Sequence, residues 1–295
     1  DIYGRIFVVP AFGGITNLLL EHKKSGEPGV YAHLANASND HGWHEALTRV
    51  SAEMQRVHRE VLEHPGDIEQ ADAFVSERTH GARNCLIDLQ RLCAYGHFRL
   101  SEHMLQIREL LSGLGEAHSA FVTTIMLQRA GVNARFVDLS GWRDEGNVTL
   151  DERIAQAMEG IDPQTEMPIV TGYAHTQDGL MSSFDGGYSE MTFSRLTVIT
   201  NAREAVIHKE FHLSSADPRI VGDDNAVPIG RTNYDVADQL ANLGMEAIHP
   251  KAAKGLRQNN IPLRVKNTFE PEHAGTLITS DYISEKPRVE IIAGC

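Results

Sequence analysis

The sequence predicts an α/β fold with a mainly parallel central sheet and a long helical insert. Two observations carry this prediction. From about residue 116 onward, short apolar runs typical of strands alternate with helical segments of about 10–15 residues, which indicates βαβ units. Between about residues 40 and 112 the pattern is helical throughout, and no strand signal interrupts it.

The first elements surround a glycine-rich turn. An apolar run at residues 5–9 predicts a strand, and the turn at 11–17 follows it. A helical segment at 18–24 comes next and ends at the breaker 25–29. Three further helical segments make up the insert, at residues 43–62, 69–95 and 101–111.

The elements after the insert alternate between the two types. Helices are predicted at residues 116–130, 151–159, 189–201, 234–243 and 250–258. Strands are predicted at residues 134–139, 167–174, 205–209, 262–267 and 275–278. One more apolar strand is expected at 287–294, where the sequence stops as though a further domain followed.

Composition limits the classes of function. The chain has 295 residues, 41% of them apolar, which is enough for one large α/β domain or two smaller ones. It has no apolar run of about 18 residues, which argues against a membrane-spanning helix. The net charge of −13 disfavours nucleic acid and anionic membranes as partners. Cys85, Cys93 and Cys295 lack metal-type spacing, so we expect no metal site and a reduced, cytoplasmic protein.

The first candidate site is the turn that contains Gly13, Gly14 and Thr16. Glycines let a ligand approach the backbone, and a helix start directs free N–H groups at an anion. The hydroxyl of Thr16 suits either a helix cap or an anion. The pattern alone leaves open whether this is a binding turn or an ordinary strand-to-helix turn.

Two further turns carry candidate residues for binding. Glu116 follows Gly113 and Gly115 at an expected helix start, where it is either an ordinary first-turn residue or the acceptor of a substrate ammonium group. Residues 184–190 form a second glycine-rich turn. Two such turns in one α/β domain favour a site at the carboxyl edge of the sheet, with room for both partners of a phosphoryl transfer.

A polar segment follows the strand predicted at 205–209. Lys209 and Arg219 are its natural phosphate partners, the first as a point charge and the second as a fork of donors. A merely solvated loop is the alternative. The Gly-x-x-x-x-Gly-Lys-Ser/Thr motif and the protein-kinase loop motifs are absent from the sequence.

Taken together, the motifs resemble the aspartokinase family, which has the amino-acid-kinase fold. The resemblance extends from about residue 5 to 278, and it rests on the order and spacing of five motifs. These are residues 5–17, like the family's strand and Ser-Ala-x-x-Gly-x-Thr-Asn turn; 114–116, like His-Gly-Glu; 185–190, at the place of Gly-Arg-Gly-Gly-Ser-Asp; 215–219, like Thr-x-Asp-Pro-Arg; and 243–250, like Phe-Gly-Ala-Lys-x-Leu-His-Pro. Residues 208–218 and 230–238 most resemble the aspartokinases associated with ectoine biosynthesis.

This resemblance implies a domain organisation. It implies a three-layer αβα sandwich of the carbamate-kinase type over residues 1–280, without the family's first strand and with the helical insert at about 40–112. Residues 281–295 would begin a linker to absent C-terminal regulatory (ACT) domains. Through those domains the protein would form a homo-oligomer.

The resemblance also implies a reaction and a set of site residues. The reaction is transfer of the γ-phosphoryl group of ATP to the β-carboxylate of L-aspartate, with Mg²⁺. The implied substrate-binding residues are Gly13, Gly14, Thr16, Glu116, Gly187, Ser189 and Glu190. The implied nucleotide-binding residues are His208, Lys209, Ser214, Asp217, Arg219 and Glu246. Of all these, Glu116, Ser189 and Lys209 are the expected catalytic residues.

Several departures from the family pattern bear on activity. The family's first strand carries a phosphate-binding lysine, and nothing before Asp1 supplies it. Gly186 stands where the family has an arginine, and Pro10 stands where it has a serine. Lys209 stands where the family has an aspartate, and Glu246 stands where it has a lysine, so the two charges are exchanged. Because losing one electrostatic donor costs about 10²–10³ in rate, we expect weak or no activity from this stretch alone.

Two alternatives to an aspartokinase stay open at this level. One is another amino-acid kinase, acting on glutamate or acetylglutamate, although the long insert favours aspartokinase. The other is a catalytically impaired regulatory or ligand-binding homologue.

Overall fold

A computed structural model describes residues 2–36, 42–144, 146–183, 187–216, 218–222, 225–242 and 247–287. The chain divides into two compact units, Asp1–Thr192 and Phe193–Cys295. One catalytic domain over residues 1–280 therefore stays a prediction. The strand expected at 287–294 lies, but for its first residue, outside the described residues.

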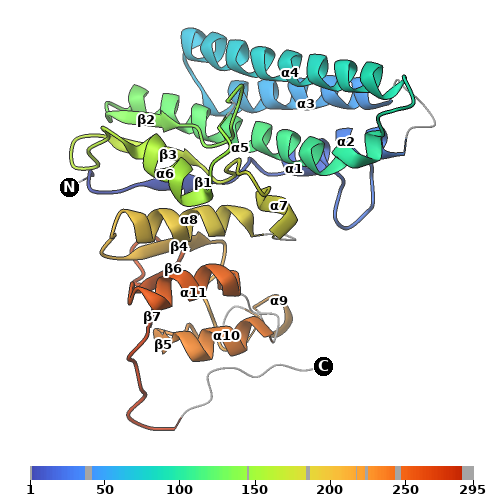
Figure 1. Cartoon of the computed structure of the whole chain (residues 1–295). Helices are drawn as coiled ribbons and strands as arrows, with labels where there is room; N and C mark the ends of the chain where they lie inside the picture. The colour runs from blue at the N-terminus through green and yellow to red at the C-terminus, as the bar shows by residue number, and fades with distance from the viewer. Residues whose placement is uncertain are drawn as a thin grey trace. The chain divides into compact units, whose positions relative to one another are not determined.

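The sheet of the first unit is parallel and has the order β1-β3-β2. Its strands are β1 (Phe7–Val9), β2 (Ala134–Val137) and β3 (Met167–Thr171). Every residue of β3 is buried, as expected of a strand with parallel neighbours on both sides. The long helix α5 (Met104–Arg129) packs along this sheet (Figure 1).

The helical insert is confirmed. It contains α3 (Gly42–Val61), α4 (Pro65–Cys93), the short 3₁₀ helix η1 (Leu100–His103) and the first half of α5, with no strand between residues 42 and 133. The two long helices α3 and α4 lie side by side (Figure 1). Alternating steps of three and four residues place the buried side chains of α3 on one face. These are Trp43, Leu47, Val50, Met54 and Val57.

The break expected between residues 111 and 116 is wrong, because α5 runs through it without interruption. Gly113 and Gly115 allow close packing there instead of forming a turn. A Cβ atom on Gly113 would lie 3.2 Å from the Ser140 Cβ atom, and one on Gly115 would lie 3.1 Å from the Ala11 Cβ atom. Glu116 is consequently in the middle of a helix and not at its start.

The shorter helices that begin in the first unit are α1 (Ile15–Leu19), α2 (Val30–Ala35), α6 (Leu150–Met158), α7 (Leu180–Ser183) and α8 (Tyr188–Ile199). Of these, α2 and α7 were not predicted from the sequence. The helix expected at 18–24 starts earlier and ends at Leu19. It ends there because the chain folds back on itself: Glu21 bridges to Pro28, and the His22 N–H donates to the Glu27 carbonyl over 2.9 Å.

The second unit contains a four-stranded sheet in the order β4-β6-β7-β5. Its elements are β4 (Ala205–Lys209), α9 (Pro218–Val221), β5 (Arg231–Asn233), α10 (Tyr234–Asn242), α11 (Pro250–Gln258), β6 (Leu263–Asn267) and β7 (Thr276–Thr279). The described pairings of both sheets are parallel except that of β6 with β7. That connection is too short for a parallel crossover, which needs about a dozen residues. The predicted α/β fold with mainly parallel pairing is confirmed.

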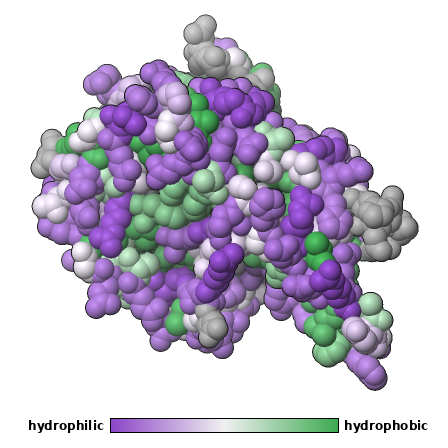
Figure 2. Space-filling model, turned by 90° about the horizontal axis from the view of Figure 1, so that it is seen from above, coloured by the Kyte–Doolittle hydropathy of each residue, from purple (hydrophilic) through white to green (hydrophobic). Residues whose placement is uncertain are grey.

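The segment Leu100–Arg129 is long and apolar enough to span a membrane, which the sequence analysis overlooked. However, 72% of its most apolar window is buried inside the protein. Figure 2 shows hydrophilic residues over most of the visible face, with hydrophobic residues gathered in smaller areas. The apolar character of α5 therefore serves the core of the first unit.

Candidate active site

The best-defined candidate site surrounds the Glu116 carboxylate. Glu116 is only 2% exposed, at the middle of α5. The Ser189 hydroxyl, in the first turn of α8, donates to Glu116 Oε1 over 3.2 Å. Both residues were predicted from the sequence, and the structure brings them together although 73 positions separate them.

Burial changes the protonation of this carboxylate. Removal from water raises the pKa of Glu116 to about 7, against the smaller opposing effects of Ser189 and of the N–H groups of Ala11, Gly172 and Tyr173. Among the described residues, none completes a regular hydrogen bond to Glu116 Oε2. This atom is therefore a buried acceptor with capacity for a donor from a ligand.

Gly172 forms the wall opposite Glu116 and was not among the predicted site residues. It is the first residue beyond the carboxyl end of β3, and its N–H donates to the Val9 carbonyl over 3.0 Å. A Cβ atom at this position would overlap Glu116 Oε2 and would stand 2.7 Å from Ser189 Oγ. A glycine inside an expected buried strand is the signal that indicates such a close approach.

Two tyrosines, Tyr173 buried and Tyr188 half-buried, complete the surroundings and were also missed as site residues. The rings of Tyr173 and Tyr188 meet edge to face, with centroids 5.9 Å apart. Burial raises the pKa of both phenols, and the nearby Glu116 carboxylate adds to the effect at Tyr188. Both hydroxyls therefore remain protonated donors at neutral pH.

Gly13 and Gly14 precede the short helix α1, and Thr16 is the second residue of that helix. Gly14 has a φ of 84°, a left-handed conformation that favours glycine. Cβ atoms added to Gly13 or Gly14 would meet no described atom within 4 Å. The neighbouring Ala11 N–H acts on Glu116, so the start of this turn adjoins the carboxylate.

The second glycine-rich turn is described only in part. Gly187, with a φ of 72°, leads directly into α8, and Glu190 lies in the first turn of that helix. Residues 184–186, which include Gly186 in place of the family's arginine, lie outside the described residues.

The predicted nucleotide residues belong to the second unit. His208 and Lys209 end β4, and their partners in the register are Lys266 and Asn267 of β6. Burial lowers the pKa of His208, and the Lys266 charge lowers it further. Both side chains lie at the carboxyl edge of the sheet, where α/β proteins bind ligands.

The remaining nucleotide residues are described incompletely. Ser214 is buried, and its hydroxyl donates to the His212 carbonyl over 3.1 Å, so it serves its own loop here. Asp217 and Glu246 lie outside the described residues, and for Arg219 only the backbone, in α9, is described. Among the described residues, no group of three or more His, Cys, Asp or Glu side chains is arranged to hold a metal ion.

The fold described above is that of a known family of proteins. The model of the amino acid kinase family matches residues 3–267, and the chain belongs to that family.

Curated relatives narrow the likeness to aspartokinases. The chain is 56% identical to aspartate kinase Ask_Ect of Stutzerimonas stutzeri, over 99% of this chain and 62% of the relative. It is 26% identical to aspartokinase 1, chloroplastic, of Arabidopsis thaliana, over 93% of this chain and 46% of that protein. The chain thus spans between about half and three fifths of the length of these relatives.

Solved structures agree on the fold. Aspartokinase III of E. coli in complex with aspartate and ADP superposes with a TM-score of 0.66 at 19% identity, over 95% of this chain and 58% of that one. The aspartate kinase of Clostridium acetobutylicum superposes with a TM-score of 0.58 at 18% identity, over 94% of this chain and 56% of that one.

Proposed function

We propose that this protein is an aspartate kinase, which transfers the γ-phosphoryl group of ATP to the β-carboxylate of L-aspartate. The observation that carries the proposal is the buried Glu116 carboxylate with an open acceptor atom, in a chain 56% identical to an aspartate kinase. An anionic acceptor in a nearly closed site calls for a cationic ligand group. The ammonium group of an amino acid supplies one.

The proposed roles follow from position. Glu116 receives the ammonium group, while the backbone at Gly13, Gly14 and Gly187 and the side chains of Thr16 and Glu190 shape the rest of the substrate site. Ser189 lies beside the β-carboxylate. A carboxylate oxygen then attacks the γ-phosphorus, the bond to the β,γ-bridging oxygen breaks, and ADP and aspartyl phosphate result. No covalent enzyme intermediate is required, because alignment and neutralisation of charge suffice.

The nucleotide side is proposed at the carboxyl end of β4. Lys209 neutralises charge on the transferring phosphate, and His208, Ser214, Asp217, Arg219 and Glu246 line the nucleotide. Mg²⁺ would be bound chiefly by the phosphates, because this ion retains water and takes few protein ligands. We further propose that the protein is a cytoplasmic homo-oligomer. We propose a role in ectoine biosynthesis from the resemblance of residues 208–218 and 230–238 and from the 56% identity to the S. stutzeri relative named Ask_Ect.

The test is phosphorylation of aspartate by the purified full chain with Mg²⁺-ATP. Hydroxylamine converts the acyl phosphate to a hydroxamate, which is measured directly. L-Glutamate and N-acetylglutamate serve as competing substrates. Turnover of L-aspartate alone supports the proposal, whereas turnover of either competitor in its place would contradict it. ATP binding with no turnover of any of the three would favour a catalytically impaired homologue.

A pair of variants assigns the activity to the site. Glu116→Gln keeps the shape of the side chain but removes the charge that receives the ammonium group. We expect its kcat/KM for aspartate to fall by about 10²-fold or more. Asp88→Asn, on the exposed surface of α4, is the matched control and should leave kcat/KM unchanged.

A further inference from the structure

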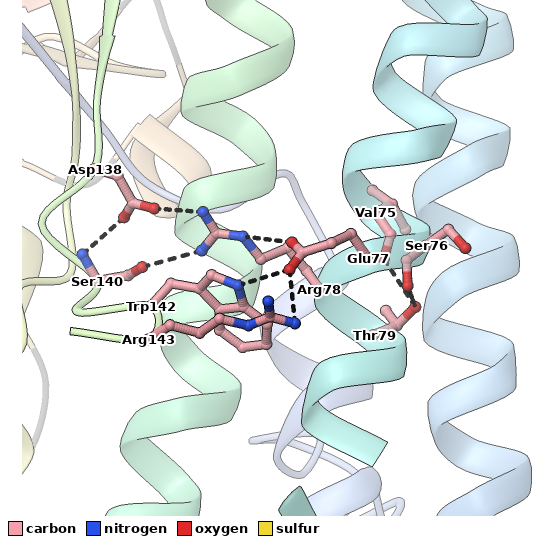
Figure 3. Close-up of polar contacts among 9 residues, drawn as sticks. All are labelled: Val75, Ser76, Glu77, Arg78, Thr79, Asp138, Ser140, Trp142 and Arg143. Carbon is pink, nitrogen blue, oxygen red and sulfur yellow. Dashed lines mark hydrogen bonds and ion pairs between the residues drawn. The ribbon is translucent and has the colours of Figure 1, made fainter. Parts of the chain in front are cut away.

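The helical insert is tied to the loop that follows β2 through one arginine of α4. The Arg78 side chain is only 11% exposed. Its Nη2 atom pairs with Asp138 Oδ2 over 2.6 Å, and its Nη1 atom donates to Ser140 Oγ over 3.4 Å (Figure 3). Asp138 Oδ1 also accepts the Ser140 N–H over 2.8 Å. The guanidinium group therefore fixes the start of the loop by one charged and one polar contact, and Asp138 adds a hydrogen bond within the loop.

Aromatic rings hold the guanidinium group in place. Its carbon lies 4.7 Å from the centre of the Phe74 ring and 4.8 Å from that of Trp142. Trp142 comes from the loop itself, and its indole N–H donates to Glu77 over 3.1 Å (Figure 3). Gly81 leaves the room that the indole occupies, since a Cβ atom there would collide with it. Lysine could not reproduce this arrangement, because it lacks the planar group that stacks on rings.

The loop passes this constraint to the segment after β3. The Leu139 N–H donates to Thr171 Oγ1 over 3.0 Å, and the His175 N–H donates to the Leu139 carbonyl over 2.8 Å. The Thr171 hydroxyl in turn donates to the Tyr173 carbonyl over 2.9 Å. Gly141 packs so closely on His175 that a Cβ atom would overlap it. Residues 171–175 are thus held on one side by the loop that Arg78 secures.

The same segment supplies one wall of the candidate site. The N–H groups of Gly172 and Tyr173 favour the ionised form of Glu116, and Gly172 leaves the space for its Oε2 atom. A shift of a few tenths of an ångström in this segment would change both effects. Misplacement by about 1 Å of a group that binds substrate costs up to about 10²-fold in rate.

We propose that Arg78 is a positioning residue for the substrate site: by holding the loop 138–142 it keeps Gly172 and Tyr173 in place beside Glu116. The helical insert thereby takes part in binding without contacting the substrate. This role rests on the proposed function, since aspartate is the ligand whose binding it would affect. It assigns no chemical step to Arg78.

The test compares Arg78→Met and Arg78→Lys with the unaltered full chain. For Arg78→Met we expect the KM for aspartate to rise about tenfold while kcat changes less than about twofold, because the loss concerns binding and not the reaction. The KM of Arg78→Lys should lie between those of Arg78→Met and the unaltered chain, since lysine keeps the charge but not the stacking. Arg91→Met, an exposed arginine of the same helix, should leave KM unchanged.

A second measurement does not depend on substrate. The pH dependence of the unfolding free energy reports the pKa of Glu116, and weaker N–H contacts should raise that pKa in Arg78→Met by about half a unit. Asp138→Asn should have the same effect, and the double variant should add little to either single one.

The outcomes separate the two proposals. If Arg78→Met lowers the melting temperature but leaves both the KM and the pKa of Glu116 unchanged, Arg78 is only structural and the inference is wrong. If the unaltered chain neither binds nor phosphorylates aspartate, the proposed function fails. In that case a raised pKa of Glu116 in Arg78→Met would still support the positioning role, and an unchanged one would overturn it.

Discussion

Binding of aspartate should be coupled to ionisation of Glu116, and pH is the perturbation that reveals this. The pKa of Glu116 in the free protein is raised to about 7 by burial. Only the ionised carboxylate can pair with an ammonium group, so protonation competes with binding. The apparent Kd should therefore rise by the factor 1 + 10^(7−pH), which is about 11 at pH 6 and about 1.1 at pH 8.

Isothermal calorimetry without nucleotide measures this directly. At pH 6, binding should release about 0.9 proton per aspartate, seen as a dependence of the observed heat on the ionisation enthalpy of the buffer. Glu116→Gln should bind about 10²-fold more weakly at pH 8, with no proton release and no change of Kd between pH 6 and 8. Equal Kd values at pH 6 and 8 in the unaltered chain would refute the reasoning.

The raised pKa of Glu116 also predicts how the unfolding free energy changes with pH. The folded-state pKa of about 7 lies above the reference value of 4.5. The stabilising contribution of Glu116 to the unfolding free energy is therefore fully present below pH 4.5. It is lost as pH rises through 7, and the unfolding free energy falls by about 3 kcal/mol in all. Glu116→Gln should remove this loss, as measured by urea unfolding at pH 4.5 and 8.

Two further substitutions test the packing around the site and the insert. Gly172→Ala should lower the unfolding free energy by about 1–3 kcal/mol and weaken aspartate binding, since its Cβ would overlap Glu116. Gly66→Ala is the control and should have neither effect, because open space surrounds Gly66. His118 is buried against His58, and burial lowers its pKa to about 3. Its neutral form therefore stabilises the fold above pH 6.5, and this stability is lost as pH falls toward 3. His118→Phe should make the unfolding free energy less sensitive between pH 7 and 4; an unchanged slope would contradict the assignment.

Much of the fold could be predicted because its signals are local. The apolar runs of β3 and β4 and the helical spacing of α3 are periodicities within one element, and the structure confirms them. The prediction that Glu116 and Ser189 belong to one substrate site was reached differently. It came from a family resemblance that links motifs far apart in the sequence.

What could not be predicted depends on distant partners. Gly113 and Gly115 gave the local signal of a turn, but the reason for their small size lies in Ala11 and Ser140, which approach α5 from other parts of the chain. A glycine for close packing and a glycine for a turn look the same in one sequence. Gly172, inside a predicted buried strand, did carry the local signal of a close approach, but that signal does not identify Glu116 as the neighbour.

A comparison within α5 explains why Glu116, and not merely any buried carboxylate, points to a ligand. Glu109 is also buried in this helix, but its Oε1 atom accepts the main-chain N–H of Met181 over 2.9 Å, so the protein itself provides its partner. The Glu116 Oε1 atom accepts the Ser189 hydroxyl, whereas its Oε2 atom has no regular hydrogen bond among the described residues. A buried acceptor left open lowers stability unless something outside the chain completes it. A ligand ammonium group would do so, and the cost in the free protein would then be recovered as affinity.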